Sequence, residues 1–451
     1  MFDTIVALAT PPGVGAIGVI RVSGPKTIQI VNEVFRGKNL EEVNSHTIHL
    51  GTIRDGEEII DEVLVSIFKA PNSYTKEDVI EISCHGSHFI IQQLIKLLLK
   101  HGARLAKPGE FTQRAFVNGR FDLAQAEAVA DLIASENESM HSAAIKQMRG
   151  GFSIEIKKLR EELIHFASMI ELELDFSEED VEFASREDLK KLVYSLKGLI
   201  TRLTESFTLG NAIKNGIPTV IAGKPNAGKS TLLNALLNEE KAIVSDIPGT
   251  TRDVIEDVIN VDSIAFRFTD TAGIRTTDDK VEAIGVERTY AKMKDAAVII
   301  YLIDMIHDSV YDLETQINYL KELEVPYLLI GNKLDKAHPE LQKALEQEKA
   351  LFISASQKHN LENLKEALKE LVSLDAFKSG NTIVTNLRHY EGLMSTNQAL
   401  DQVLEGIDNE VTNDFVAMDI RNALHHLGEL TGEITTEDLL DNIFSKFCIG
   451  K

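Results

Sequence analysis

The stretch "TVIAGKPNAGKSTLLNALL", Thr219 to Leu237, decides the fold of the middle of the chain. It reads as a β-branched strand, the pattern G-x-x-x-x-G-K-S from Gly223 to Ser230, and an apolar segment with helical spacing. Glycine lets backbone N–H groups turn toward a phosphate, and the start of the helix adds positive potential there. Lys229 can reach the β- and γ-phosphates, and the Ser230 hydroxyl can bind Mg²⁺. The stretch therefore predicts a strand, a loop and a helix that hold a nucleoside triphosphate.

The residues around this loop, about 214 to 373, alternate β-rich runs with helix-like segments. The β-rich runs are "IAFRFTDT", "AAVIIYLID", "YLLIGNK" and "ALFISAS". Alternation of this kind predicts a mostly parallel sheet with helices on both of its faces.

Two short segments that follow β-rich runs indicate selection of guanine. "NKLD" contains Asn332, Lys333 and Asp335. The Asp335 carboxylate can accept hydrogen bonds from N1–H and the exocyclic amine of guanine, and adenine offers neither at those positions. Backbone N–H groups of "SAS", Ser354 to Ser356, can donate to the guanine O6. These segments predict GTP as the nucleotide.

Two loops between these motifs complete the predicted site. "GTTRD" offers Thr250 and Thr251, one of which would bind Mg²⁺, and "DTAG" places Asp270 near the metal and the Gly273 N–H near the γ-phosphate. The residues predicted to bind GTP are Asn226, Ala227, Gly228, Lys229, Ser230, Thr231, Ser245, Asp246, Ile247, Pro248, Gly249, Thr250, Thr251, Asp270, Thr271, Ala272, Gly273, Asn332, Lys333, Leu334, Asp335, Ser354, Ala355 and Ser356.

Two positions distinguish this site from a Ras-type GTPase. Ile274 follows "DTAG", where Ras-type proteins carry the Gln that orients the attacking water. Glu282 in "DKVEAIG" is the nearest carboxylate that can take that role, and an ordinary solvated residue is the alternative. Asn226 lies inside the loop, where its amide oxygen can bind a monovalent cation or can simply stabilise the loop.

The flanking parts of the chain have a different character. Residues 1 to about 118 read as mixed α/β, and the residues from 119 to 213 and from 374 to 451 read as mainly helical. We expect one helical domain interrupted by an insertion, with two small separate bundles as the alternative. "GVGAIG" at Gly13 to Gly18 fits a dinucleotide fingerprint, but β-branched residues follow it where a helix would be needed, so tight turns are predicted there.

Composition limits the classes of function. The net charge of −23 excludes a surface that coats nucleic acid by charge alone, although a local basic patch or a basic partner stays open. The two cysteines are too few for a disulfide framework and indicate a reduced chain. The N-terminus lacks the basic region of a signal peptide, and no apolar run approaches the ~20 residues that cross a bilayer. A cytoplasmic protein without a membrane anchor is expected.

The sequence closes with "FCIGK", which makes Cys448 the fourth residue from the end. In a prenylation box the Cys is followed by two aliphatic residues and then by a final residue that is usually Ser, Met, Gln, Ala or Leu. Gly450 stands at the second aliphatic position and Lys451 at the final one, which argues against prenylation. The remaining readings are a reactive thiol carried to a site by the tail, or a packed cysteine. Cys84 has His85 and His88 nearby but no fourth ligand, and no metal site is predicted there.

The nucleotide motifs, "KPGEFTQRAFVNGRFDLAQAEAV" (Lys107 to Val129) and the terminal "CIGK" together resemble the MnmE (TrmE) family of tRNA-modification GTPases over essentially the whole chain. The resemblance implies an α/β folate-binding and dimerisation domain at 1–118. It also implies a discontinuous helical domain at 119–213 and 374–451, and an inserted Ras-like P-loop G domain at 214–373.

The family also implies an activity and partners. It implies potassium-dependent GTP hydrolysis by a homodimer, and a heterotetramer with the flavoprotein MnmG (GidA), which would bind FAD and NADH. Together they would add an aminomethyl or carboxymethylaminomethyl group to carbon 5 of the wobble uridine of certain tRNAs, and tRNA would be bound mainly through the partner. A tetrahydrofolate derivative (5-formyl or 5,10-methylene) would supply the one-carbon unit, and glycine or ammonium the nitrogen.

The resemblance implies roles for single residues. Glu282 would act on water, and Cys448 would act in the modification. The remaining assignments are K⁺ to Asn226, Ser245, Ile247 and Thr250, Mg²⁺ to Ser230 and Thr251, and folate to Arg21, Glu81, Arg120 and Lys451. Two departures stand out: "CHGS" replaces the commoner C-H-G-G, and Arg120 stands where some relatives have Lys.

Two rival functions remain on sequence grounds. A regulatory or ribosome-assembly GTPase would share the nucleotide motifs but would not need a folate domain or a "CIGK" tail. A prenylated signalling GTPase would require the lipid that the C-terminus disfavours.

Overall fold

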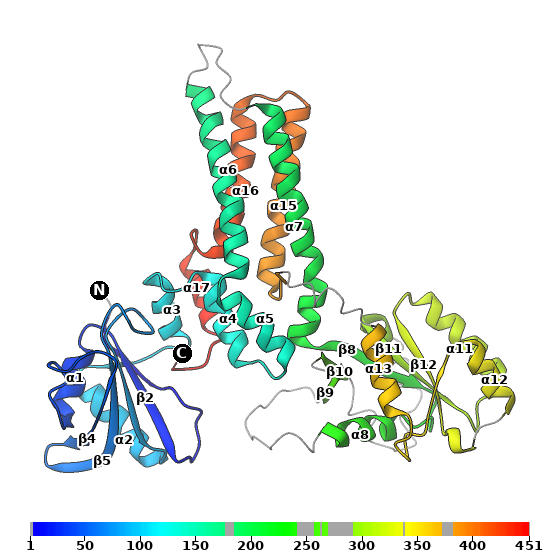
Figure 1. The fold of residues 1–451 in the computed structure, drawn as a ribbon, viewed down its shortest axis with the longest axis horizontal. Helices are drawn as coiled ribbons and strands as arrows, with labels where there is room; N and C mark the ends of the chain where they lie inside the picture. Colours follow the sequence, from blue (N-terminus) through cyan, green and yellow to red (C-terminus); the bar gives the residue numbers. More distant parts are fainter. Residues whose placement is uncertain are drawn as a thin grey trace. The chain divides into compact units, whose positions relative to one another are not determined.

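The computed structural model describes residues 3–175, 185–240, 257–261, 264–268, 292–336, 339–371 and 382–450 (Figure 1). The chain divides into two compact units. The first comprises residues 1–134, 144–198 and 392–451, and the second comprises residues 135–143 and 199–391.

A seven-stranded sheet in the order β3-β4-β5-β6-β2-β1-β7 forms the N-terminal part of the first unit. All neighbours are antiparallel except β1 and β7. The strands are β1 Ile5–Leu8, β2 Ile17–Ser23, β3 Phe35–Arg36, β4 Thr47–Asp55, β5 Glu58–Phe68, β6 Val79–His85 and β7 Arg104–Leu105. As expected, "GVGAIG" leads into strand β2 and not into a helix.

Two helices, α1 Thr27–Val34 and α2 His88–Lys100, cover one face of this sheet. Along β5, the buried Val63, Val65 and Ile67 alternate with exposed residues, and they share a core with Leu94 of α2. The two-residue alternation of a strand and the apolar stripe of a helix therefore meet in one core.

The rest of the first unit is helical. Its helices include α3 Glu110–Val117, α4 Leu123–Ile133, α6 Gly151–Asp175, α16 Asn413–Thr431 and α17 Glu437–Phe444, whereas α5 Glu138–Met148, α7 Arg186–Asn215 and α15 Leu387–Asp408 contribute to both units. Helix α4 begins with the predicted capping box of Asp122 and Gln125. The helical stretch at 121–148 is divided, because the Asn137 side chain accepts from the Met140 N–H and starts α5 as a new helix.

Helix α6 from the first helical segment packs along α16 from the second. Arg421 pairs with Glu171 at 2.7 Å, and Asn413 donates to Glu173 at 2.9 Å. The expected discontinuous helical domain is therefore confirmed, and the alternative of two separate bundles is wrong.

The second unit is built on a six-stranded sheet in the order β13-β12-β11-β8-β10-β9. Only β9 and β10 are antiparallel neighbours. The described strands are β8 Ile217–Gly223, β9 Asp257–Val261, β10 Ile264–Phe268, β11 Val298–Asp304, β12 Tyr327–Asn332 and β13 Leu351–Ile353. The described helices include α8 Lys229–Glu240, α11 Val310–Glu322, α12 Pro339–Gln347 and α13 Leu361–Leu371.

Alternate residues of the central strand β11 enter two separate cores. Ile300 and Leu302 lie in the core shared with α8 and α13, and Ile299 and Ile303 lie in the core shared with α11 and α12. The sheet is therefore covered on both faces, as the alternating sequence pattern predicts. No helix in the described part of the chain has the length and apolar character needed to span a membrane.

Candidate functional site

The loop between β8 and α8 already has the shape of a phosphate cradle. Gly223, Asn226 and Gly228 all have positive φ, at 144°, 63° and 99°. A Cβ at Gly228 would lie 2.3 Å from the Asn332 Nδ2 atom, so only glycine fits there. Lys229 starts α8, and its ammonium donates to the carbonyl oxygens of Gly223 (2.8 Å) and Lys224 (2.9 Å). The cationic side chain therefore lies across the loop that would receive phosphates.

Asn332 joins three of the predicted nucleotide segments. It is buried, its Nδ2 donates to the Ala227 carbonyl at 2.7 Å, and its Oδ1 accepts from the Ala355 N–H at 3.1 Å. The Asp335 carboxylate is exposed and accepts from the Ser354 hydroxyl at 3.1 Å. A cavity of about 330 Å³ beside these segments is lined by Ser230, Thr231, Asn234, Ala235, Ala355, Ser356 and Lys358.

Asp304, at the end of β11, is a part of this site that the sequence motifs do not reveal. The Lys333 ammonium lies 2.6 Å from its carboxylate, and His307 Nδ1 lies 2.9 Å from the same oxygen. Burial alone would raise the pKa of Asp304, but the hydrogen bonds from Lys333 and His307 outweigh burial and leave the pKa below its ordinary value. Asp304 therefore holds the lysine of "NKLD" in place as an ion pair.

Several predicted residues lie outside the described part of the chain. They are Ser245, Asp246, Ile247, Pro248, Gly249, Thr250, Thr251, Asp270, Thr271, Ala272, Gly273, Glu282 and Lys451.

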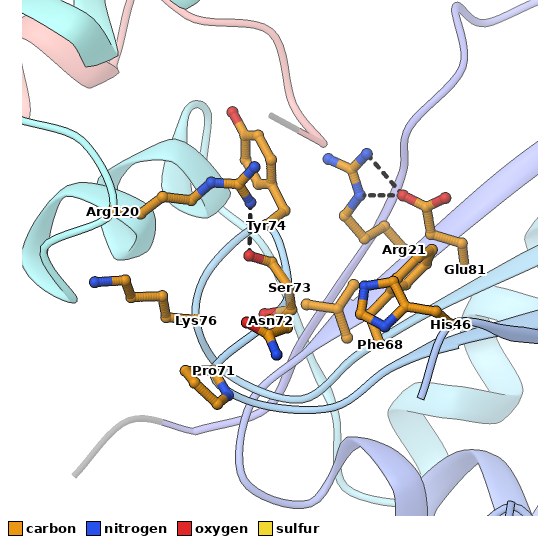
Figure 2. A pocket seen from close by; sticks show the side chains of 11 residues that line it. Arg21, His46, Phe68, Pro71, Asn72, Ser73, Tyr74, Lys76, Glu81 and Arg120 are labelled. Atoms are coloured by element: carbon orange, nitrogen blue, oxygen red, sulfur yellow. Dashed lines mark hydrogen bonds and ion pairs between the residues drawn. The ribbon is translucent and has the colours of Figure 1, made fainter. Parts of the chain in front are cut away.

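A second cavity, of about 510 Å³, lies in the N-terminal domain and brings together Arg21, Glu81 and Arg120 (Figure 2). Arg21 and Glu81 are partners across β2 and β6, and two guanidinium nitrogens lie 2.9 and 2.8 Å from one Glu81 oxygen. The cavity is also lined by His46, Phe68, Pro71, Asn72, Ser73, Tyr74, Lys76 and Val79. It therefore offers a paired donor and acceptor at one end and a further cation at the other.

Tyr74 separates these two ends, and sequence reasoning did not identify it. The Arg21 guanidinium lies 5.1 Å and the Arg120 guanidinium 5.0 Å from its ring centre. Phe121 adds a second ring beside Arg120, at 5.1 Å from the guanidinium. A flat, electron-rich wall of this kind suits a planar heterocycle or a bound cation.

The segment from Lys107 to Val129, which carries the family resemblance, holds the loop that contains Tyr74 in place. Asn118 donates to the Thr75 carbonyl at 2.6 Å, and Arg120 donates to the Ser73 carbonyl at 2.6 Å. The Tyr74 and Thr112 hydroxyls are 2.9 Å apart. The block therefore fixes the loop at residues 71–77 from one side.

Buried ion pairs stabilise the same segment. The Arg114 guanidinium is buried and lies 3.0 Å from Glu110 and 3.2 Å from Glu77. Burial would raise the pKa of Glu110, but Arg104 and the Lys107 N–H hold it below its ordinary value. Glu110 and Arg114 of "GEFTQR" therefore form a buried ion pair and do not line the cavity as reactive groups.

The C-terminal tail lies at the rim of this cavity. The Gly450 carbonyl accepts from Arg21 at 3.2 Å, and the Cys448 carbonyl accepts from the Gly109 N–H at 3.4 Å. Gly450 has φ of 95°, and a Cβ there would lie 2.3 Å from the Leu8 carbonyl oxygen. The Cys448 side chain is exposed, which argues against a packed cysteine.

Cys84 is the opposite case. It is buried, its thiol donates to the Gly18 carbonyl at 3.4 Å, and burial, reinforced by Asp61, raises its pKa to about 11. His85 is engaged by Asp61 at 2.7 Å. Among the described residues no cluster of His, Cys, Asp and Glu side chains could hold a metal ion.

Comparison with known proteins adds the family. Residues 4–120 match the model of the "GTP-binding protein TrmE N-terminus", and residues 123–448 match that of the "MnmE helical domain". The chain is 60% identical to "tRNA modification GTPase MnmE" of Cytophaga hutchinsonii, over 100% of this chain and 98% of the relative. It is 50% identical to the protein of the same name from Bacteroides thetaiotaomicron, over 100% of this chain and 99% of the relative.

A solved structure of an Aquifex aeolicus Era variant bound to GDP and AlF4⁻ is 28% identical, with a TM-score of 0.27, and covers 40% of this chain and 65% of that one. The full-length identity and the two family models carry the assignment. The chain belongs to the MnmE family of tRNA modification GTPases.

Proposed function

We propose that this GTPase works with MnmG (GidA) to add an aminomethyl or carboxymethylaminomethyl group to carbon 5 of the wobble uridine in certain tRNAs. The observation that supports this most is the tail contact. The Gly450 carbonyl is bonded to Arg21 at the rim of the cavity that Arg21, Glu81 and Arg120 share. A chain with a GTP site thus also presents a thiol-bearing tail at a heterocycle-sized cavity.

A tetrahydrofolate derivative fits the residues of this cavity. The Arg21–Glu81 pair offers a donor and an acceptor for the edge of a pterin, and Tyr74 lines the cavity between the Arg21 and Arg120 guanidinium groups. Arg120 offers a cation for a carboxylate. When bound, the folate would supply the one-carbon unit; Arg21 and Glu81 orient its ring, and the tail brings Cys448 to it. We also propose that Lys451 contacts the folate, and that FAD and NADH bind to the MnmG partner.

The test is nucleoside analysis of tRNA from a strain that lacks this gene. Wild-type chain is expected to restore the modified wobble uridine, and Cys448→Ser is expected not to restore it while GTP hydrolysis continues. Full modification by Cys448→Ser would return the cysteine to a structural role. Unmodified tRNA after wild-type complementation would refute the proposal as a whole.

GTP hydrolysis is proposed to depend on Mg²⁺ held by Ser230 and Thr251 and on K⁺ held by Asn226, Ser245, Ile247 and Thr250. Asn226 supports this because it is exposed in the loop at a positive φ of 63°. Glu282 would align the attacking water. Glu282→Ala should lower turnover by roughly 10²–10⁴ and leave GTP affinity unchanged, measured by single-turnover kinetics and titration. Loss of GTP affinity as well would make Glu282 structural.

A homodimer through the N-terminal sheet is proposed as the assembly. Leu50 of β4 and Leu64 of β5 are register partners and are 64% and 46% exposed, and Ile48 beside them is 65% exposed. Exposed apolar strips of this kind mark protein interfaces. Leu50→Glu is therefore expected to produce monomers in analytical ultracentrifugation, and an unchanged dimer would exclude this face.

The tRNA is proposed to bind mainly through the MnmG partner in the cytoplasm. The net charge of −23 supports this because it opposes the phosphate backbone. Weak tRNA binding by this chain alone and tight binding by the complex would fit, and tight salt-sensitive binding by the chain alone would not.

A further inference from the structure

Two cations on one side of the N-terminal cavity have no carboxylate partner among the residues that the structure describes. The Arg120 guanidinium donates to the Ser73 carbonyl, and the Lys76 ammonium donates to the Gly119 carbonyl at 2.8 Å. Figure 2 shows both side chains on the side of Tyr74 away from the Arg21–Glu81 pair. Neither cation forms an ion pair with any acid that the structure describes.

This is unusual for so acidic a chain. It has 70 acidic and 47 basic residues, and Arg21, Arg104 and Arg114 of the same domain all pair with carboxylates. The acids next to Lys76 in sequence are directed elsewhere. Glu77 bonds Arg114 and the Ser23 hydroxyl, and Asp78 accepts from the Ala70 N–H. The two positive charges are therefore left available to an anion.

Both cations are held in place before any ligand arrives. Lys76 is bonded to the carbonyl of Gly119, the residue next to Arg120, and Arg120 is bonded back to the loop that carries Lys76. Tyr74 and Phe121 flank the Arg120 guanidinium at 5.0 and 5.1 Å. Because the backbone carbonyls neutralise neither charge, a carboxylate that reached this rim would gain charge-assisted hydrogen bonds at little ordering cost.

We propose that Lys76 and Arg120 form a subsite for the γ-linked glutamate tail of a folate, so that the cavity prefers folates with several glutamates. The inference rests on the folate site of the proposed function and names the form of the ligand. A single glutamate places its carboxylates near Arg120, and each added glutamate offers Lys76 one further carboxylate. The heterocycle faces the Arg21–Glu81 pair at the other end of the same cavity.

The experiment measures binding of 5-formyl-tetrahydrofolate with one, three or five glutamates to the full-length chain by isothermal titration calorimetry. The wild type should bind the pentaglutamate on the order of tenfold more tightly than the monoglutamate, as one added charge-assisted bond provides. That ratio should fall toward one in Lys76→Gln and should also shrink at high salt, because the rim is open to solvent.

Lys69→Gln is the matched control. The Lys69 ammonium also donates to a backbone carbonyl, that of Glu41, but Lys69 does not line the cavity. The wild-type ratio should survive in this variant. A pterin-free γ-glutamyl pentapeptide should bind far more weakly than the pentaglutamate folate, because it lacks the group that faces Arg21 and Glu81.

The failing outcomes are distinct. Equal affinity of the wild type for the monoglutamate and the pentaglutamate would overturn this inference and leave the folate site standing. An equal loss of the ratio in Lys69→Gln would overturn the assignment to Lys76. Binding of none of the folates would overturn the folate site and this inference together.

Discussion

The nucleotide site and the N-terminal cavity are assembled in different ways. In the second unit, the phosphate loop, Asn332 and Ser354 lie at the carboxyl ends of the parallel strands β8, β12 and β13, with β11 between β8 and β12, so the fold brings them to one edge. In the N-terminal domain, Arg21 meets Glu81, 60 positions away, and Gly450, 429 positions away.

The difference decides what a short motif can reveal. A loop after a parallel strand must carry its functional residues next to one another, so the sequence shows them as contiguous patterns. A cavity on an antiparallel sheet takes single residues from distant segments, and no local pattern records them. Substitutions in the first kind of site should act directly on the ligand, whereas those in the second should act through the chain segments that meet there.

The largest expected effect concerns the nucleotide site, where a substitution acts directly on the ligand. Asp335→Asn should weaken GTP binding on the order of 10³-fold, because two hydrogen bonds from guanine to a charged carboxylate are lost. The variant should prefer xanthosine triphosphate, whose base presents the complementary edge. Competitive titration of the two nucleotides measures both effects. Glu362→Gln, a surface change in the same unit, is the control, and unchanged GTP affinity in Asp335→Asn would remove Asp335 from the site.

Much of the fold was predictable from the sequence because burial leaves a pattern. The central strands of the second unit are apolar on both faces, and their runs were recognised. Strand β9, Asp257–Val261, was not, since this five-residue edge strand alternates buried and exposed positions. The break between α4 and α5 was also missed, because one capping residue, Asn137, sets it within a continuous helical pattern.

The two sites were predictable to different degrees. In the described part of the chain, Asn332 links the loop after β8 to "SAS" through Ala227 and Ala355. Tyr74, Lys76 and Asp304 were missed because their roles depend on contacts with distant residues that composition and spacing do not encode. Arg21, Glu81 and Arg120 came only from the family resemblance, and the structure does gather them in one cavity.

The second prediction concerns the cation that should assist hydrolysis. The predicted site has Ile274 in place of the water-orienting Gln of Ras-type proteins, and no arginine finger is assigned to it. A positive charge between the β- and γ-phosphates must therefore come from another source. An arginine finger contributes roughly 10³–10⁵ in rate, and K⁺ at Asn226 should supply part of it, on the order of 10². Steady-state phosphate release should be faster in KCl than in NaCl, with loss of the difference in Asn226→Ala. Equal rates in both salts for the wild type would contradict the role.

The third prediction tests the N-terminal cavity through the C-terminal tail that contacts Arg21. Gly450→Ala places a Cβ against the Leu8 carbonyl at a φ that disfavours alanine, so the tail should leave Arg21. We expect folate affinity to fall about tenfold, close to the loss of one hydrogen bond to a charged group. Titration with 5-formyl-tetrahydrofolate measures it. Ile449→Ala is the matched control because that side chain is 60% exposed. Equal affinities in both variants would mean that tail docking does not shape the cavity.

The smallest expected effect concerns Asp304, which supports the nucleotide site without belonging to any motif. Asp304→Asn removes the charge that pairs with Lys333 at 2.6 Å, and the opening free energy of β11 and β12 should fall by about 1 kcal/mol at neutral pH. Because the folded-state pKa of Asp304 is lowered, this stabilisation is present above the unfolded value of about 3.9 and is lost as pH falls through the folded value.

Hydrogen exchange of peptides from β11 and β12 in the full-length chain should therefore be about fivefold faster in Asp304→Asn at neutral pH, and the two proteins should converge only as the pH falls below about 3.9 and through the lowered folded pKa of Asp304. Glu348→Gln is the control, since that carboxylate is 41% exposed, lies 3.8 Å from Lys321, and an exposed pair contributes little. A difference that persisted unchanged into acid would show that the Asp304 charge is not its source. The asparagine shape would then be responsible, and Lys333 would be held by the loop rather than by the ion pair.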